Sequence, residues 1–561
     1  MGDPPRELGG NVAQRLAESA KLAPDGPAII VCDAHGRSRS EISFRRLDEL
    51  VNRLAAGLIA NGLAPGDRIV LMVRPGQEFL ALVFALFRAG AVVVLIDPGM
   101  GLKHVIDCLE GICPRGFVSV PSVQWARWYW QRKFPVARLN VHVGGWAPSS
   151  LSYRRLALSD PGQLQPPTIT GTDPAAIIFT SGSTGPAKGV EYEHGMFCAQ
   201  ADLLREHFDI KPGEKDLPAF PLFAMFNTAM GVTSVFPSFD PTRPAAVDPR
   251  HVIAPIQVQQ VSQAFGSPAL WDRVGRYCQS EGITLPSLVR VLSAGAPVPP
   301  RVVRSIRNVL QAPNADIYTP YGATEALPVS VISGEEIDTE TADRSARGSG
   351  TCVGRLFPGI DVRIIPIDDS PISSFEDLEL LRAGEIGEIL VRGPSVTRRY
   401  FRHDQATTLA KVPDGSSVWH RMGDLGYLDD QNRLWFCGRK AHRVETDEGL
   451  LFSVPCESIY NEHPSVFRSA LVGLGPRPRQ TPVIVVELTP GVGDPTDRLA
   501  AELLALGAAH TLTARIHDIL FHPSLPVDIR HNVKIDRERL AFWATGQCSP
   551  DAQEQPGMHH T

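Results

Sequence analysis

The sequence predicts an α/β protein. We expect a large N-terminal domain of parallel-rich sheets flanked by helices plus a β subdomain, and a small mobile α+β C-terminal domain. The 561 residues are too many for one ordinary hydrophobic core. Helical and strand patterns alternate between about residues 40 and 170, as they do in parallel sheets covered by helices. From about Gly348 the apolar runs become short and separate, which favours the β subdomain.

The alternating region contains clear periodic segments. Residues 44–63 have the spacing of a helix, and residues 68–73 predict a strand. Residues 79–87 then suit a buried helix and residues 91–96 a buried parallel strand, with Arg88 interrupting the apolar run. We therefore interpret this strongest apolar stretch as a β-α-β fragment rather than a membrane span.

Two later apolar runs, residues 260–266 and 288–292, end in small residues. The first leads into Gly266-Ser267-Pro268 and the second into the segment 293–297. Ligands of open α/β sheets bind beyond the carboxyl ends of strands, so both turns are expected near a site.

The chain is expected to divide near residue 440. We predict a large domain over 1–437, a hinge over 438–441, a small domain over 442–545 and a disordered tail over 546–561. Strands are expected in the β subdomain at 362–365, 388–391 and 434–436. The small domain contains strand patterns at 469–472 and 482–488 and a helical pattern near 497–506.

Composition narrows the class of protein. Hydrophobic content of 43% and charged content of 21% are typical of a globular chain. A net charge of −6 without a long basic run argues against a nucleic-acid surface. The nine cysteines are scattered without a C-x-x-C pair, which favours free thiols in a reducing cytoplasm over a zinc site. The polar N-terminus shows no signal peptide.

The segment Thr180-Ser181-Gly182-Ser183-Thr184-Gly185-Pro186-Ala187-Lys188-Gly189 is the most informative in the chain. It follows a predicted buried strand over 175–179. Its glycines allow tight turns and close backbone approach, and its hydroxyls and lysine suit phosphate oxygens. It does not fit the P-loop pattern. A phosphate-binding loop is the functional interpretation, and a polar surface turn is the alternative.

This loop resembles the signature of the adenylate-forming superfamily, which contains acyl-CoA synthetases, luciferases and peptide-synthetase adenylation domains. Further segments resemble that family's other motifs in the same order, and the resemblance extends from about residue 20 to 545. It implies that ATP activates a carboxylate as an acyl-adenylate. It also implies that Thr184 and Lys188 contact the phosphates during catalysis.

The segment Tyr321-Gly322-Ala323-Thr324-Glu325 resembles the second family signature. By this resemblance the ring of Tyr321 stacks on adenine beside Gly322, and Thr324 holds the α-phosphate. Glu325 binds Mg²⁺, a hard cation that prefers carboxylate oxygen. The preceding loop supplies the adenine side of the pocket with Gly295, Ala296 and Pro297. A turn followed by a surface acid is the alternative.

Three residues nearer the C-terminus complete the implied site. Asp424, in Met422-Gly423-Asp424, resembles the carboxylate that accepts both ribose hydroxyls. Arg439 resembles the arginine that contacts ribose or phosphate. Lys534 resembles the catalytic lysine of the small domain, whose charge offsets that on the α-phosphate when the domain closes. Met422 replaces the family's usual threonine, and an alanine, residue 441, stands at the pivot position.

Two further departures concern the acyl group and its acceptor. Phe223, Ala224, Met225 and Phe226 form an apolar segment where relatives usually carry a histidine at the position of Ala224. This segment predicts an acyl pocket, with a core helix as the alternative. Residues 445–448 contain three carboxylates that would repel the phosphates of coenzyme A, although a solvated acidic turn explains them equally well.

The segments 223–228 and 525–532 resemble the β-lactone synthetases of bacterial long-chain olefin biosynthesis. That resemblance implies a 2-alkyl-3-hydroxy fatty acid as substrate. Its 3-hydroxyl would attack the adenylated carboxyl and release AMP from a β-lactone. ATP and Mg²⁺ are the expected cofactors, and assembly with other enzymes of the olefin pathway is implied. A medium- or long-chain acyl-CoA ligase and an inactive adenylate-binding scaffold are the alternatives.

Overall fold

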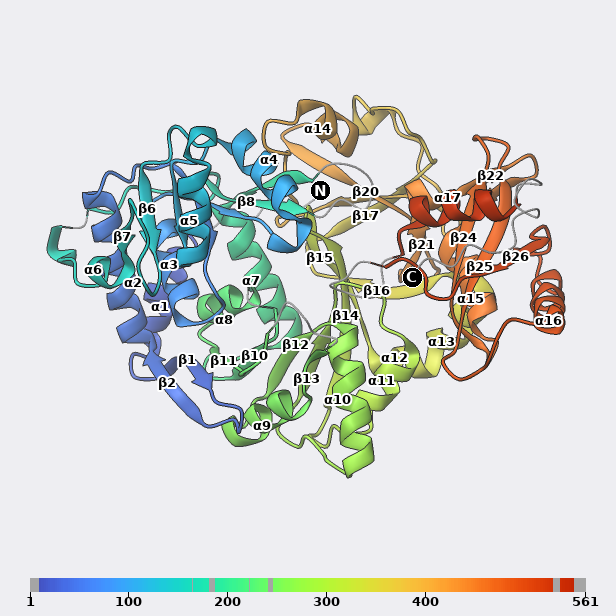
Figure 1. Cartoon of the computed structure of the whole chain (residues 1–561), viewed down its shortest axis with the longest axis horizontal. Helices are drawn as coiled ribbons and strands as arrows, with labels where there is room; N and C mark the ends of the chain where they lie inside the picture. Colours follow the sequence, from blue (N-terminus) through green and yellow to red (C-terminus); the bar gives the residue numbers. More distant parts are fainter. Residues whose placement is uncertain are drawn as a thin grey trace.

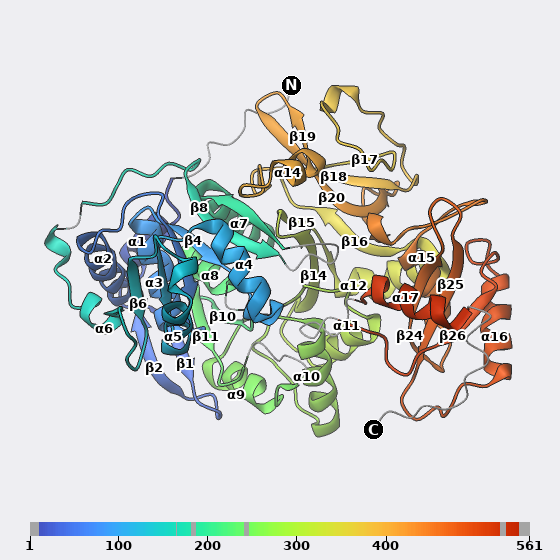
Figure 2. The ribbon, with the colours of Figure 1, turned by 45° about the horizontal axis from the view of Figure 1, so that its top comes forward.

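The structure is a computed structural model that describes residues 10–163, 165–180, 187–220, 222–240, 246–527 and 535–548. Two large sheets with their helices occupy most of the molecule, and the orange and red C-terminal part forms a lobe at one end (Figures 1 and 2). The predicted α/β class is confirmed by this arrangement.

The first sheet has the strand order β7-β6-β5-β3-β4-β8-β9 and is parallel except for the β8–β9 hairpin. Its strands are β3 (Arg68–Met72), β4 (Val92–Leu95), β5 (Gly116–Ser119), β6 (Leu139–His142), β7 (Leu151–Ser152), β8 (Pro174–Thr180) and β9 (Lys188–Glu193). Its helices are α2 (Phe44–Ala60), α3 (Gln77–Arg88), α4 (Leu102–Ile112), α5 (Pro121–Tyr129) and α6 (Tyr153–Leu156).

The expected β-α-β fragment is confirmed by β3, α3 and β4. The charge inside its apolar run is neutralised, because Arg88 donates hydrogen bonds of 2.7 Å to both Asp48 and Asn52 of α2. Helix α2 ends at Ala60, earlier than expected, because Gly62 adopts a φ of +90° that stops the helix.

The second sheet is built around parallel strands and flanked by helices. The strands are β1 (Pro27–Cys32), β2 (Ser38–Ser43), β10 (Lys215–Pro218), β11 (Thr233–Phe236), β12 (Gln263–Gly266), β13 (Arg290–Ser293), β14 (Asp316–Ala323) and β15 (Ala326–Ser333). The helices are α1 (Ala13–Leu22), α7 (His194–Phe208), α8 (Phe223–Met230), α9 (Arg250–Gln259), α10 (Pro268–Glu281), α11 (Pro300–Arg307), α12 (Gly334–Glu336) and α13 (Ala342–Arg344).

The strands expected for a β subdomain are present, but they do not form a sheet of their own. Strand β16 (Thr351–Leu356) pairs with β15 on one side and β21 (Leu434–Arg439) on the other. The second sheet therefore continues through β21 and β20 (Ser417–Leu428) to β18 (Gly387–Arg392) and β17 (Asp361–Ile365). Strand β19 (Lys411–Asp414), preceded by α14 (Asp404–Ala410), pairs with β20.

The C-terminal lobe has two small cores of its own on either side of a three-stranded sheet. Its elements are β22 (Val444–Thr446), β23 (Gly449–Leu451), α15 (Ser453–Asn461), β24 (Val466–Leu474), β25 (Thr481–Leu488), α16 (Asp497–Ala508), β26 (Asp518–Phe521) and α17 (Arg537–Cys548). The expected disordered tail is wrong at its start, because residues 546–548 belong to α17. The domain boundaries themselves stay predictions, since Gly438 and Arg439 are still part of β21.

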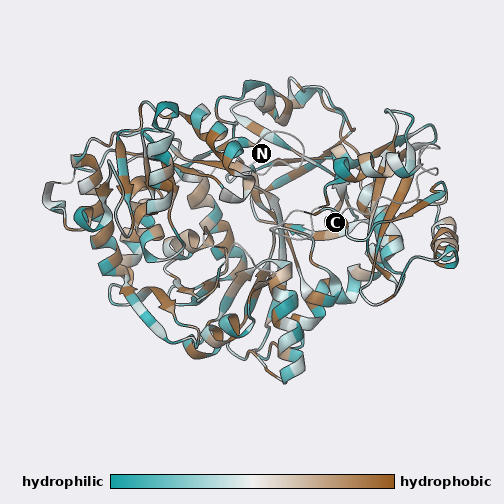
Figure 3. Cartoon of the chain, viewed as in Figure 1, coloured by the Kyte–Doolittle hydropathy of each residue, from teal (hydrophilic) through white to brown (hydrophobic). Residues whose placement is uncertain are grey.

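The most hydrophobic residues are frequent on the strands (Figure 3), and buried apolar residues of strands and helices form the two main cores. Within the described ranges, no helix is both long and apolar enough to cross a membrane. The eight cysteines whose side chains are described carry free thiols.

Candidate functional site

The predicted phosphate loop joins the two strands of an antiparallel hairpin. Strand β8 ends at Thr180 and β9 begins at Lys188, and these two residues are opposite each other in the register. The expected strand over 175–179 is thereby confirmed. The loop residues Ser181, Gly182, Ser183, Thr184 and Gly185 lie outside the described residues, as do the side chain of Thr180 and the whole of Lys534.

Glu325 lies at the turn of the β14–β15 hairpin, where a neighbouring segment holds it. The hydroxyl of Tyr400 donates a hydrogen bond of 2.8 Å to Oε1 of Glu325. Thr397 donates to the carbonyl of Glu325 twice, from its amide at 2.9 Å and from Oγ1 at 3.0 Å. The glutamate is therefore fixed through both its backbone and one side-chain oxygen.

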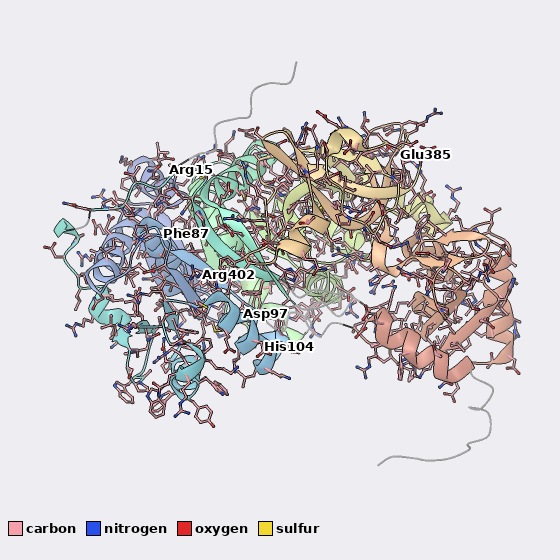
Figure 4. The ribbon with its side chains drawn as sticks, turned by 90° about the horizontal axis from the view of Figure 1, so that it is seen from above. Arg15, Phe87, Asp97, His104, Glu385 and Arg402 are labelled. Atoms are coloured by element: carbon pink, nitrogen blue, oxygen red, sulfur yellow. The ribbon has the colours of Figure 1, made fainter. Side chains whose placement is uncertain are left out.

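The segment 396–402 ties the two large sheets together at this point. Val396 forms a β-bridge with Ala326 of β15, and Tyr400 forms one with Val190 of β9. Arg402, labelled in Figure 4, donates to the carbonyl of Gly111 in α4 at 3.4 Å. The segment 396–402 therefore fixes the position of Glu325 relative to the β8–β9 hairpin.

Lys188 contacts the ring of Tyr400, the residue whose hydroxyl is bonded to Glu325. Its Nζ lies 5.4 Å from the ring centroid, within cation–π range. Burial, followed by the charge of Glu325, raises the pKa of Tyr400, so its hydroxyl stays a donor at neutral pH. A cation and a carboxylate thus flank one phenol, an arrangement that suits a phosphate chain with a bound divalent cation.

Lys411 contacts Thr397, the residue that bonds to Glu325, and it was not predicted from the sequence. It is buried, and its Nζ donates to the carbonyl of Thr397 and to Oγ1 of Thr397 at 3.1 Å. Burial lowers the pKa of Lys411 to about 7, and the charge of Glu325 offsets part of this effect. The only sequence signal for it was a lysine between two apolar residues, Ala410 and Val412, at a strand end.

The buried His420 is surrounded by cations. Burial first, then the charge of Lys411 and the more distant charges of Arg439 and Lys188, hold the pKa of His420 well below its ordinary value. Its Nδ1 lies 3.2 Å from the carbonyl of Ala410. The histidine is therefore neutral at neutral pH.

Tyr321, Asp424 and Arg439 form a second connected group. Tyr321 donates from its hydroxyl to Oδ2 of Asp424 at 2.6 Å, and Nη1 of Arg439 lies 3.0 Å from Oδ1 of Asp424. Asp424 and Arg439 are cross-strand neighbours on β20 and β21. Arg439 also donates to the carbonyl of Met422 at 3.3 Å. The acceptor expected for ribose is thus buried and is held by one hydrogen bond from Tyr321 and one ion pair with Arg439.

Gly438, the residue before Arg439, allows the Asp424–Arg439 pair to lie close to the C-terminal lobe. Gly438 has a φ of +123°, and a side chain there would meet Oγ of Ser453 in α15 at 2.3 Å. Only glycine fits such a backbone position. Helix α15 can therefore pack directly against the strand that carries Arg439.

The expected adenine-side loop follows β13. Strands β12, β13 and β14 are parallel neighbours, so the turn after Gly266, the loop over 294–297 and the Tyr321 region lie at the same edge of the sheet. Gly295 has a φ of +92°, and Gly295 and Pro297 are exposed while Ala296 is half-buried. In the neighbouring β14–β15 turn, the carbonyl of Thr324 accepts a hydrogen bond from Tyr192 of β9. A side chain at position 322 would collide with the carbonyl of Ala326, which explains Gly322.

A small cavity lies beside helix α8. Its lining consists of Leu204, Ile210, Asp216, Phe223, Phe226, Asn227, Met230, Gln263, Phe265 and Leu292. Phe223 stacks on Phe265 with ring centroids 3.8 Å apart. Of the four residues predicted for an acyl pocket, Phe223 and Phe226 line the cavity, whereas Ala224 and Met225 pack in the main core.

One wall of the cavity is polar. The carboxylate of Asp216 accepts hydrogen bonds from Asn227 at 2.6 Å and Gln263 at 3.1 Å. Burial raises the pKa of Asp216 to about 7. Arg290 donates to Gln263 at 2.7 Å and extends this network away from the cavity. An apolar chain entering past Phe223 would end against these polar groups.

The acidic segment 445–448 is not a patch of free negative charge. Arg443 lies 2.8 Å from the carboxylate of Glu445, and Arg479 lies 3.2 Å from that of Asp447. Arg515 covers the turn by donating to the carbonyls of Glu448 and Leu450. Arginines therefore pair with two of the three carboxylates, Glu445 and Asp447, and the repulsion of coenzyme A by this segment stays a prediction.

The chain belongs to the family of AMP-binding enzymes. The family's sequence model, described as AMP-binding enzyme, matches residues 16–401. The chain is 47% identical over 552 residues to an olefin beta-lactone synthetase from Xanthomonas campestris pv. campestris, covering 96% of this chain and 98% of the relative. It is 46% identical over 556 residues to an olefin beta-lactone synthetase from Stenotrophomonas maltophilia, covering 97% and 99%.

A solved structure supports the fold. The amide bond synthetase McbA from Marinactinospora thermotolerans superposes with a TM-score of 0.78 at 22% identity, covering 95% of this chain and 99% of that one. The sequence-based assignment to the adenylate-forming superfamily is confirmed by these comparisons.

Proposed function

We propose that the chain is an ATP-dependent β-lactone synthetase acting on 2-alkyl-3-hydroxy fatty acids in long-chain olefin biosynthesis. The observation that carries this proposal is the 47% identity, over nearly the whole of both chains, to a relative named for that activity. The two connected groups around Glu325 and Asp424 support the adenylating half of the reaction.

In the first step a carboxylate oxygen of the fatty acid attacks the α-phosphorus of ATP, and the bond to diphosphate breaks. Tyr321 stacks on adenine beside the loop over 295–297, and Asp424 with Arg439 binds the ribose. The loop over 180–185, with Lys188, holds the phosphates. Lys534 reaches the α-phosphate when the small domain closes, and its charge is needed mainly in the transition state.

Glu325 fits the role of a Mg²⁺ ligand. Its Oε1 already accepts from Tyr400, which orients the carboxylate, and the residue is only half-buried. One carboxylate plus phosphate oxygens is the donor set that Mg²⁺ prefers, because the ion keeps several of its waters. When bound, the ion would neutralise charge on the phosphate chain. Thr324 would contact the α-phosphate from the same turn.

In the second step the 3-hydroxyl oxygen attacks the acyl carbon of the adenylate. The bond between this carbon and the AMP oxygen breaks, the hydroxyl proton is lost, and the products are a β-lactone and AMP. An intramolecular nucleophile needs no second substrate, which lowers the entropy cost of the step. One alkyl chain of the substrate would pack against Phe223, Phe226 and Met230, and the small cavity that they line would have to widen to admit it.

An acyl-CoA ligase shares the first step and is the rival proposal. The test is to incubate the protein with ATP, Mg²⁺ and a 2-alkyl-3-hydroxy acid without any thiol, and to identify the product by mass spectrometry and NMR. A β-lactone and AMP in equal amounts are expected. Product that appears only when coenzyme A is added would favour the ligase.

Exchange of labelled diphosphate into ATP tests the third alternative, an inactive adenylate-binding scaffold. Acid-dependent exchange is expected, since Glu325, Asp424, Arg439 and Lys534 are all present. The absence of exchange with every acid tested would favour the scaffold. Assembly with other olefin-pathway enzymes and a cytoplasmic location are part of the same proposal.

A further inference from the structure

Helix α5 buries polar side chains and exposes aromatic ones. Gln124 is fully buried and donates to the carbonyls of Phe117 and Val141 at 2.8 and 2.9 Å. Arg127 is also buried and donates to Gln124 at 2.9 Å. Three aromatic residues of the same helix, Trp125, Trp128 and Tyr129, are instead 44, 42 and 75% exposed. This is the reverse of the usual helix on the surface of a water-soluble protein.

These side chains belong to a larger aromatic cluster. Trp146, in the loop between β6 and β7, is 67% exposed, and its ring centroid lies 5.7 Å from that of Trp125. Trp125 contacts Trp128 edge to face at 5.9 Å. Four of the eight tryptophans of the chain fall between residues 125 and 146. Contiguous exposed rings from two elements mark an interaction surface rather than scattered apolar residues.

The surroundings of this aromatic cluster are basic, although the whole chain has a net charge of −6. Residues 114–159 contain no Asp or Glu and seven basic residues, namely Arg115, Arg127, Arg132, Lys133, Arg138, Arg154 and Arg155. Arg132, Arg138, Arg154 and Arg155 are exposed. Lys133 is paired with Glu110 at 2.7 Å. These residues lie on α5, on α6 and beside β5 and β6, one edge of the first sheet.

We propose that this surface, Trp125, Trp128, Tyr129 and Trp146 with Arg132 and Arg138, docks the protein onto the surface of an anionic lipid bilayer. Tryptophan and tyrosine prefer the headgroup region, where the ring is in an apolar layer and the polar atom reaches water. Basic side chains around the rings are attracted by anionic headgroups. A protein partner would have to match both the rings and the basic residues around them.

The position of the surface suits this role. Helix α5 lies on the outside of the lobe opposite the C-terminal lobe (Figures 1 and 2), so docking leaves that lobe free. Under the proposed function, a substrate with two long alkyl chains partitions into bilayers, and docking would bring the enzyme to it. The bilayer contact itself rests only on the surface and is tested separately from lactone formation.

Co-sedimentation of the full chain with vesicles tests the proposal. Binding is expected to vesicles of phosphatidylglycerol and phosphatidylcholine, to be weaker with phosphatidylcholine alone, and to fall as salt rises. The variant Trp125→Ser/Trp128→Ser/Tyr129→Ser should lose binding by about tenfold or more. Arg132→Glu/Arg138→Glu should lose it to a similar extent. Vesicles with lipids brominated near the headgroup should quench the fluorescence of the wild type more than that of the aromatic variant.

Matched controls come from the other end of the molecule. Phe542→Ser removes an aromatic side chain that is 85% exposed on α17, and Arg498→Glu reverses an exposed charge on α16. Both should bind vesicles like the wild type, and all variants should exchange diphosphate with a short soluble acid at the wild-type rate. Equal vesicle binding by the wild type and the aromatic variant would overturn the proposal. So would self-association that depends on the aromatic residues without any vesicle binding, since the surface would then be a protein interface.

Discussion

Tyr400 donates a hydrogen bond of 2.8 Å to Oε1 of Glu325, while its ring lies 5.4 Å from Nζ of Lys188. One phenol therefore links the expected metal ligand with a lysine of the phosphate hairpin. The link spans three separate regions of the chain, and the segment 396–402 holds them together through β-bridges to β9 and β15.

Replacing Tyr400 by Phe should weaken the response to Mg²⁺. Without the hydroxyl, the carboxylate of Glu325 loses the donor that orients it, and a hydrogen bond to a charged group is worth about 1.5–3 kcal/mol. We expect the Mg²⁺ concentration for half-maximal diphosphate exchange to rise about tenfold. Tyr427→Phe is the control, because its hydroxyl bonds to the carbonyl of Ser349. An unchanged Mg²⁺ dependence would show that the Tyr400 hydroxyl does not orient the metal ligand, whereas Glu325→Ala with an unchanged metal requirement would remove Glu325 from the metal site.

Replacing Asp424 by Asn should weaken nucleotide binding. The amide cannot accept from Tyr321, Arg439 and the ribose hydroxyls as a carboxylate does. We expect the Kd for AMP, measured by calorimetry, to rise by about 10- to 100-fold. The control is Asp361→Asn on the edge strand β17. It disturbs a surface ion pair with Arg392 of β18 and should leave the Kd unchanged. Wild-type affinity in Asp424→Asn would contradict the assignment of the ribose acceptor.

Lys411 should make stability depend on pH. The pKa of Lys411 falls from the ordinary 10.5 to about 7 on folding, so between these pH values the unfolded chain binds the extra proton. The free energy of unfolding therefore rises with pH across that window, by up to about 1.4 kcal/mol per pH unit. This contribution is complete above pH 10.5 and has been lost once the pH has fallen to about 7. Lys411→Met should flatten the rise in unfolding midpoint between pH 7 and 10. Lys211→Met, an exposed control, should keep it. Equal slopes in wild type and Lys411→Met would show that the buried amine stays charged.

Lys534→Ala should slow adenylation by a large factor while sparing ATP binding, since its charge acts mainly in the transition state. The measurements are diphosphate exchange and, separately, the Kd for ATP. Lys211→Ala serves as the control for loss of a lysine. Adenylation at the wild-type rate would refute the catalytic assignment.

Filling the cavity beside α8 should shorten the preferred acyl chain. Met230→Trp adds volume between Phe226 and the polar wall, and overpacking of this kind costs about 1–3 kcal/mol. We expect kcat/KM for long-chain acids to fall at least tenfold, with little change for short ones. The short acid is the internal control for folding. A parallel loss for all chain lengths would show that the cavity is not the acyl site.

Strong local patterns made much of the fold predictable. Residues 79–87 and 91–96 were expected as helix and strand because a nearly continuous apolar run leaves few other arrangements. Gly295 and Glu325 were expected from the segments around them, and they follow the carboxyl ends of the neighbouring strands β13 and β14. Their roles and that of Asp424 stay predictions. Tyr400 and Lys411 were not predicted, because neither a tyrosine in a connecting segment nor a lysine at the start of a strand has a distinctive local pattern.

The sequence alone determined the α/β class, the phosphate hairpin and the family, since periodicity, glycine positions and motif order are properties of neighbouring residues. Only the tertiary structure decided which distant side chains contact one another. It placed Tyr400 between Glu325 and Lys188, paired Glu445 and Asp447 with arginines, and turned the rings of α5 outward. Such pairings join residues far apart in the chain, and only packing of the sheets fixes which charges meet and which faces stay exposed.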